Sequence, residues 1–173
     1  IAFSGFHLFT AATGAYPPQI QRAVHLGFVL VLIYLLYPAR ATGSKHKLAW
    51  YDVLPAAAGA AVCGYIVWNY DVIVLDAGPP TEMDFFFGCA AILLVLEATR
   101  RIVGLPITLV AICFLLYAKF GNLIPGMMGH PGFSLKRIVG HMYLTTEGLF
   151  GMPLGVSASF VFLFILFGAF LHS

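Results

Sequence analysis

The stretch LFGMPLGVSASFVFLFILFGAFL, residues 149–171, contains 23 consecutive residues without Lys, Arg, Asp or Glu. A helix that crosses the hydrocarbon core of a bilayer needs about 20 predominantly apolar residues. The stretch is therefore long enough and apolar enough to cross a membrane, and we predict that it does.

The whole chain has the same character. Of its 173 residues, 61% are hydrophobic and 9% are charged, whereas a soluble domain carries about 25% charged residues. So few charges cannot coat a surface in water, and we expect lipid to cover much of the outside. The net charge of +2 and the absence of a basic cluster with interleaved aromatic residues argue against a nucleic-acid partner.

Five more apolar runs precede this stretch, and prolines such as Pro17, Pro18 and Pro38 separate some of them because proline cannot continue a helix. The sequence predicts an all-α fold, a polytopic transmembrane helical protein with about six spans. Their approximate limits are residues 1–14, 22–37, 53–70, 85–101, 102–117 and 149–171.

Two finer features accompany the spans. Small residues at Ala56, Ala60 and Gly64 lie four apart, which predicts close approach of another helix on that face. Residues 135–143 are predicted to form a short amphipathic helix that Ser134 caps. Its apolar side chains recur at i, i+3, i+4 and i+7, which favours a helix in the membrane interface or packed beneath other helices: Leu135, Ile138, Val139 and Met142.

The charged loops predict an orientation. Residues 39–51, with Arg40, Lys45 and Lys47, and the Arg100–Arg101 turn are two spans apart, so both should face the cytoplasm. The acidic loop 71–84 then faces the periplasm. Three bases fall on the outside against the rule, and an interfacial helix accounts for this in part: Lys119, Lys136 and Arg137.

Glu97, Arg100 and Arg101 lie at i, i+3 and i+4, a spacing that lets the carboxylate meet both guanidiniums on one helix. Charges within a membrane often mark an ion or substrate path. A place near the end of a span instead favours a structural charge pair that anchors the helix at the headgroups, and we favour that interpretation.

Glu147 precedes the longest apolar run, and Gly148, Gly151 and Pro153 follow it. A start broken by Gly and Pro can leave main-chain carbonyls free to line a cavity. Glu147 is therefore a weak candidate for contact with substrate, ion or a moving domain. The alternative is a capped helix start with a kink.

Other chemistry is not indicated. The cysteines at 63, 89 and 113 lack a metal-ligand spacing, which favours packing roles. His25, His130 and His141 are scattered without an HExxH pattern. A nucleophile elbow and a phosphate-binding loop are also missing, so we expect neither an enzyme nor a bound cofactor or metal.

The last third of the chain, IPGMMGHPGFSLKRIVGHMYLTTEGLFGMPLGVSASFVFLFILFGAFL at 124–171, closely resembles the fused permeases of tripartite ATP-independent periplasmic (TRAP) transporters of the TAXI type. Weaker similarities occur at 21–38, 69–84 and 96–104. The most specific part is 143–171. An acidic residue usually follows GAFL in that family, and His172 stands there instead.

The resemblance implies the N-terminal segment of a longer permease. Residues 1–120 would be the small-subunit-like region with about five spans, 121–147 the connecting segment, and 148–173 a truncated first span of the large-subunit-like region. It implies a bacterial or archaeal cytoplasmic (inner) membrane and uptake of small organic acids, driven by a sodium gradient. The implied partners are a periplasmic solute-binding protein and the remaining transport domain. The family's binding motifs lie beyond this segment, so no binding residue is transferred.

Within this interpretation, Asp76, Glu82 and Asp84 are candidates for docking the binding protein, together with residues 120–147. A second interpretation is a membrane anchoring or assembly protein without transport activity. A third, an intramembrane enzyme using Glu147 and His141, has no reaction to recommend it.

Overall fold

The structure is a computed structural model that describes residues 2–14, 16–38, 50–75 and 79–172. Every regular element in these residues is helical, which confirms the all-α part of the predicted fold class for the residues described. The elements are α1 (Ala2–Thr13), α2 (Pro18–Leu36), α3 (Trp50–Trp68), α4 (Tyr70–Leu75), α5 (Glu82–Ile102), α6 (Leu105–Phe120), the 3₁₀ turn η1 (Gly121–Leu123), α7 (Leu135–Leu144), α8 (Met152–Val156), the π-helical turn η2 (Ser157–Val161) and α9 (Phe162–His172).

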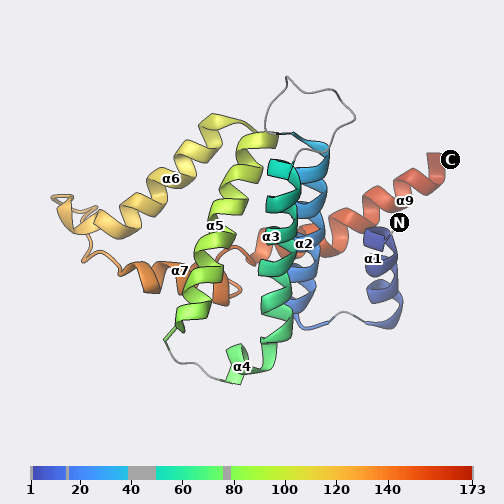
Figure 1. Ribbon diagram of the computed structural model, residues 1–173, viewed down its shortest axis with the longest axis horizontal. Coiled ribbons are helices and arrows are strands. Elements are labelled where there is room, and N and C mark those ends of the chain that lie inside the picture. Colours follow the sequence, from blue (N-terminus) through green and yellow to red (C-terminus); the bar gives the residue numbers. More distant parts are fainter. Residues whose placement is uncertain (1, 15, 39–49, 76–78, 173) are drawn as a thin grey trace.

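Helices α2, α3 and α5 form the centre of the molecule, and α7 crosses one side of α5 (Figure 1). α6 and α9 lead away from this centre on opposite sides, while α1 lies beside the start of α9. The buried side chains come mainly from the three central helices, with contributions from α7 and the segment after it. The largest of those that are almost fully enclosed are Tyr34, Tyr143, Phe150, Leu30, Ile66 and His7.

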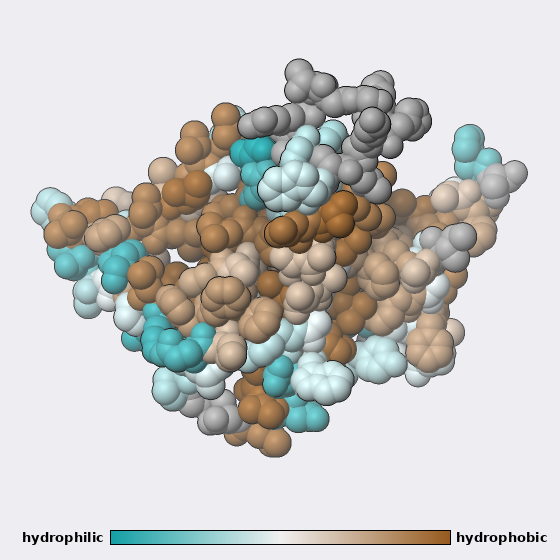
Figure 2. Space-filling view, in the orientation of Figure 1, coloured by the Kyte–Doolittle hydropathy of each residue, from teal (hydrophilic) through white to brown (hydrophobic). Residues whose placement is uncertain are grey.

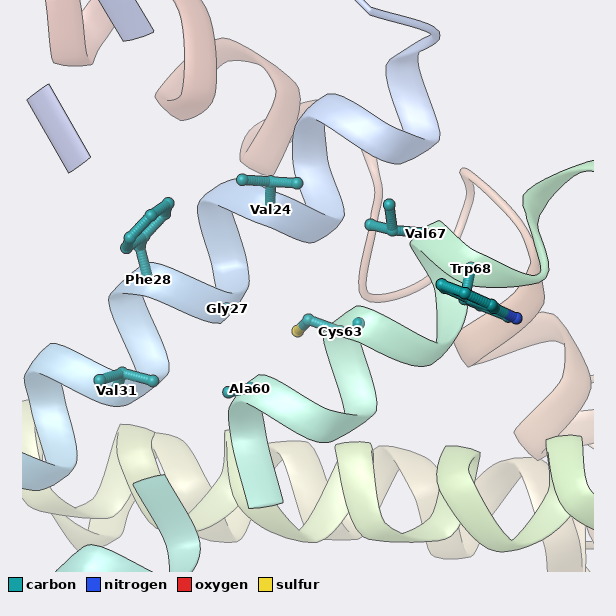
Figure 3. Close-up of a pocket in the computed structure, with 9 residues that line it drawn as sticks. Val24, Gly27, Phe28, Val31, Ala60, Cys63, Val67 and Trp68 are labelled. Carbon is teal, nitrogen blue, oxygen red and sulfur yellow. The ribbon is translucent and has the colours of Figure 1, made fainter. Parts of the chain in front are cut away.

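Glycines allow α2 and α3 to pack closely. A Cβ at Gly27 would lie 3.1 Å from Cys63 Cβ, and one at Gly59 would lie 3.0 Å from Leu30 Cβ. The expected contact face was different. Ala60 and Gly64 are exposed and line an open cavity of about 730 Å³ between the two helices (Figure 3). Ala56 of the predicted face is buried in the core, but the prediction is wrong for Ala60 and Gly64, because α2 packs against the neighbouring stripe that contains Gly59.

Four of the described helices are long and apolar enough to cross a membrane: α2, α3, residues 105–123 and residues 152–172. The two other predicted spans differ from this description. α1 has 12 residues, and α5 has 21 residues but carries five charged side chains. The structure thus indicates a membrane protein with four such helices in the described residues, and six spans are not shown.

The apolar surface is extensive (Figure 2). Only 11% of the most apolar part of 105–123 and 6% of that of 152–172 is buried. Phe114 on α6 is 68% exposed and Phe164 on α9 is 73% exposed. Soluble monomers rarely expose contiguous apolar patches of this kind, so lipid or another protein must cover these helices.

Some element limits differ from the predictions. α2 begins at Pro18, four residues earlier than expected, because proline is tolerated in the first turn of a helix. α4 lies within the stretch predicted as an acidic loop. The Ser134 cap is present, since its hydroxyl accepts from the Arg137 N–H at 3.2 Å. Arg40, Lys45, Lys47 and Asp76 lie outside the described residues.

Candidate functional site

A network of charged side chains joins the ends of three helices. Arg100 and Arg101 both bind the Glu97 carboxylate through Nε, at 2.7 and 2.9 Å. Arg101 also contacts residues distant in sequence, donating from Nη1 to Asp52 Oδ1 at 2.7 Å and to the Tyr37 carbonyl at 2.9 Å. The structure therefore brings the three predicted residues together and adds Asp52, which the sequence pattern did not single out.

Arg101 is the enclosed member of this network. Its side chain and that of Asp52 are each 5% exposed, whereas those of Arg100 and Glu97 are 37% and 35% exposed. The guanidinium of Arg101 also lies 4.6 Å from the centre of the Tyr34 ring, a cation–π contact. Buried charges need partners of this kind, so the network holds the end of α2, the start of α3 and the end of α5 together.

The acidic residues at the start of α5 do not all lie at the surface, as a docking surface would require. Asp84 is 8% exposed and forms a capping box with Thr81. Its Oδ1 also accepts from the Tyr65 hydroxyl at 2.9 Å. Glu82 is the surface carboxylate, with a side chain that is 81% exposed and paired with Lys136 of α7. Asp76 lies outside the described residues, so Glu82 is the described docking candidate at the surface.

Glu147 lies in the turn between α7 and α8 and is exposed. Its main-chain N–H donates to Thr145 Oγ1 at 3.2 Å. The turn is tight, because a Cβ at Gly148 would overlap the main chain of Met142. Among the described residues, no ion pair reaches the Glu147 carboxylate.

Polar side chains from the first turns of α2 bind the main chain of this segment. Gln19 Nε2 donates to the Leu144 carbonyl at 2.9 Å, and Arg22 Nη1 donates to the Phe150 carbonyl at 2.7 Å. Arg22 also lies against Gly155, where a Cβ would come within 2.6 Å of its Nε. This segment is thus fixed to α2 by hydrogen bonds to carbonyls that no helix satisfies.

A buried pair of histidines lies one turn further along α2. His7 of α1 and His25 of α2 are 2% and 3% exposed, and His25 Nδ1 lies 2.9 Å from His7 Nε2. The other ring nitrogen of His25 lies 3.4 Å from Ser157 Oγ. The main chain of Ala158 also lies near His7. α1, α2 and η2 therefore meet at one hydrogen-bonded cluster, which we call the histidine site.

The donors and acceptors of the histidine site depend on the tautomer of each ring. In the contact between the two rings, one nitrogen donates its proton and the other accepts through its lone pair. When His25 donates from Nδ1 to His7 Nε2, its own Nε2 can accept the proton of the Ser157 hydroxyl. The two rings and Ser157 then form a continuous chain of hydrogen bonds.

The surroundings of the histidine site are apolar on one side and polar on the other. The Phe162 ring lies 4.3 Å from His7, and the Phe3 ring lies 5.2 Å from His25, centre to centre. On the polar side, Gln21 Nε2 donates to Thr10 Oγ1 at 3.2 Å. Gln21 Oε1 is buried, and no donor from the described residues reaches it. This oxygen is an available acceptor beside the pair.

Sequence reasoning considered His25 alone and missed His7. A usable signal was present. The Tyr16–Pro17–Pro18 sequence predicts a break between two helices, and His7 of α1 and His25 of α2 lie equally far from Tyr16 along the chain. Residues at matched distances from a tight turn lie at the same depth in antiparallel helices. Thr10 and Gln21 follow a similar register.

The hydrogen bonds of the histidine site can hold the π-helical turn η2 in place. They can also pass a proton between the ring nitrogens of His7 and His25. π-turns occur often at functional sites, and histidine chains within membranes are typical of proton paths. The described residues contain no group of three or more His, Cys, Asp or Glu side chains that could hold a metal ion.

Replacing His25 by Leu is expected to lower the free energy of unfolding by about 1–3 kcal/mol, because His7 and Ser157 each lose a buried partner. The His7→Phe, His25→Leu double variant should lose less than the sum of the single variants. Thermal unfolding in detergent measures both. Additive losses would show that the two rings do not interact.

Comparison with known proteins does not place this chain: no protein-family model, curated protein or solved structure matches it.

Proposed function

We propose that this chain is the scaffold portion of a secondary-active permease of the TRAP type, which imports small organic acids delivered by a periplasmic binding protein. A sodium gradient drives uptake in this proposal. The scaffold holds a moving transport domain in the inner membrane of a bacterium or archaeon. The proposal includes six spans, with α1 and α5 crossing the membrane beside the four helices that meet the criteria of length and hydropathy.

The observation that carries the proposal is the contrast between a tightly held centre and two bare apolar helices. α2, α3 and α5 are joined by small-residue packing and by the Arg101 network. α6 and α9 leave that centre on opposite sides and are largely uncovered (Figure 1). A rigid centre that offers long apolar helices is suited to holding another membrane domain. The sequence resemblance over 124–171 supplies the transporter family.

The charges also support one orientation of this scaffold. Arg101 contacts Tyr37 and Asp52, so the residues that flank the basic stretch 39–49 lie at the same end as Arg100 and Arg101. α4 and the start of α5, where Glu82 is the first residue, lie toward the opposite end (Figure 1). The positive-inside rule would place the first end in the cytoplasm and the second in the periplasm.

The test is uptake of labelled small organic acids by proteoliposomes that contain the full-length permease and its binding protein. We expect uptake to require both the binding protein and an inward sodium gradient, with potassium unable to replace sodium. Glu82→Gln should reduce uptake several-fold at a fixed concentration of the binding protein. It should also make uptake depend less on salt concentration, because surface charges steer association. Arg100→Gln, which removes a partly exposed charge at the opposite end of α5, serves as the control.

Absence of uptake under all of these conditions would contradict the proposal and favour the second candidate, a membrane anchoring or assembly protein. The exposed α6 and α9 are compatible with that alternative, since lipid alone can cover apolar helices. Uptake that Glu82→Gln leaves unchanged would remove the start of α5 from the docking surface while leaving transport in place.

A further inference from the structure

A wedge-shaped groove lies between α5, α6 and α7. α5 ends at Ile102 and α6 begins at Leu105, so the two helices separate from a very short turn, and α7 crosses the wide end (Figure 1). The groove has a volume of about 650 Å³. Its walls are mostly apolar, and the side chains that matter below are Ala111, Leu115, Phe133, Arg137 and His141.

A second, polar recess of about 360 Å³ adjoins the wide end of this groove. It is lined by Lys119 and Phe120 of α6, Asn122, and residues 131–134. Phe133 lines both spaces, so the recess and the groove share a wall. An apolar space therefore lies beside a polar one, with Phe133 between them.

Hydrogen bonds hold the segment that shapes this junction. Phe133 N–H donates to the Ala118 carbonyl at 3.0 Å, which ties residue 133 to the last turn of α6. His130 contacts the Tyr117 carbonyl through Nε2 at 3.1 Å and accepts the Gly132 N–H at Nδ1. His130 therefore has a structural role here, and the recess is a formed feature of the chain.

The charged side chains that line the groove and the recess are basic. Arg137 stacks over the Phe133 ring at 5.0 Å on the groove side, and Lys119 lines the recess. Lys136 pairs with Glu82, but no carboxylate in the described residues pairs with Lys119 or Arg137. Within the described part of the chain, two uncompensated bases thus flank one aromatic ring at the mouth of an apolar groove.

We propose that this groove and recess form a binding site for one anionic phospholipid. The phosphate lies between Lys119 and Arg137, and an acyl chain fills the wedge between α5 and α6. A flexible chain can reach the narrow end of the wedge, whereas a helix about 10 Å across cannot. Basic pockets between membrane helices bind anionic headgroups. The lipid would also explain why these bases lie on the side where the charge rule disfavours them.

The experiment is native mass spectrometry of the intact chain in detergent with added phosphatidylglycerol or phosphatidylcholine. The wild type should retain phosphatidylglycerol at least about tenfold better than phosphatidylcholine. Lys119→Gln and Arg137→Gln should each weaken retention about fivefold, because a base near a membrane surface contributes about 1 kcal/mol to the attraction of anionic lipid. Melting temperatures check that each variant is folded.

Two further variants separate the charge from the groove. Lys136→Gln removes the same charge from α7 outside both spaces, and it should change retention less than twofold. Ala111→Trp fills the groove without changing a charge, and it should reduce retention of phosphatidylglycerol. Equal retention of both lipids, or equal losses for Lys136→Gln and Lys119→Gln, would overturn the proposal. So would displacement of the lipid by excess inorganic phosphate with no effect of Ala111→Trp, since the site would then hold a free anion.

Discussion

Replacing Arg101 by Met is expected to lower the free energy of unfolding by about 3–5 kcal/mol, the cost typical of removing one partner from a buried ion pair. Arg101 binds Glu97 of its own helix and Asp52 of α3, and it contacts the Tyr37 carbonyl at the end of α2. Met keeps much of the side-chain volume, so the loss reports charge and hydrogen bonds more than packing. Thermal unfolding of the purified protein in detergent measures it.

The matched control is Arg100→Met, because the Arg100 side chain is 37% exposed, against 5% for Arg101. Exposed ion pairs contribute little, so this variant should shift the melting temperature only slightly. Adding Asp52→Asn to Arg101→Met should recover part of the loss, because it removes the buried charge that Arg101 had compensated. Equal shifts for the two arginine variants would show that Arg101 does not hold the three helices together.

The pattern of the sequence predicted features that depend on neighbours along the chain. Apolar runs and prolines placed the helices, and the spacing of Glu97, Arg100 and Arg101 placed their contacts, since both follow from the geometry of one helix. The Ser134 cap followed from residues in a single turn.

Contacts between helices were harder to predict, for a physical reason. A helix in lipid is apolar on every side, so polarity does not reveal which face meets another helix. Residue size favoured the face with Ala60 and Gly64, yet Gly59 and Cys63 make the contact. For the same reason the pairing of Arg101 with Asp52 could not be foreseen, because it depends on how α3 and α5 are rotated.

Buried polar residues were the main omission at the candidate site. His7 and Ser157 belong to no motif along the chain, and the sequence pattern placed Asp84 in an exposed loop. In a chain with so few polar side chains, each buried one requires a partner. Polar residues at equal depth in a predicted hairpin are natural partners for one another, and this criterion pairs His7 with His25 from the sequence alone.

Substitution of Tyr143 is the second change for which we expect a large loss of stability. It tests whether α7 lies in the membrane interface or is packed beneath other helices, the two placements that the sequence allows. Its side chain is fully buried, and its hydroxyl donates to the Val62 carbonyl of α3 at 2.7 Å. Burial raises the pKa of the hydroxyl, so it stays protonated and remains a donor. The ring packs where α5 has Gly88, at which a Cβ would lie 3.2 Å from Tyr143 Cβ. Tyr143 thus connects α7 to both α3 and α5.

Tyr143→Ala is expected to lower the free energy of unfolding by about 3–5 kcal/mol, as for other large aromatic side chains removed from a core. Tyr143→Phe should lose only about 0.5–1.5 kcal/mol, the net contribution of one hydrogen bond, because the Val62 carbonyl keeps its helical partner within α3. Leu135→Ala, on the same helix at a site 54% exposed, is the control and should have little effect. A helix that only rested on the membrane surface would tolerate Tyr143→Ala as well as Leu135→Ala, whereas a helix packed beneath α5 cannot.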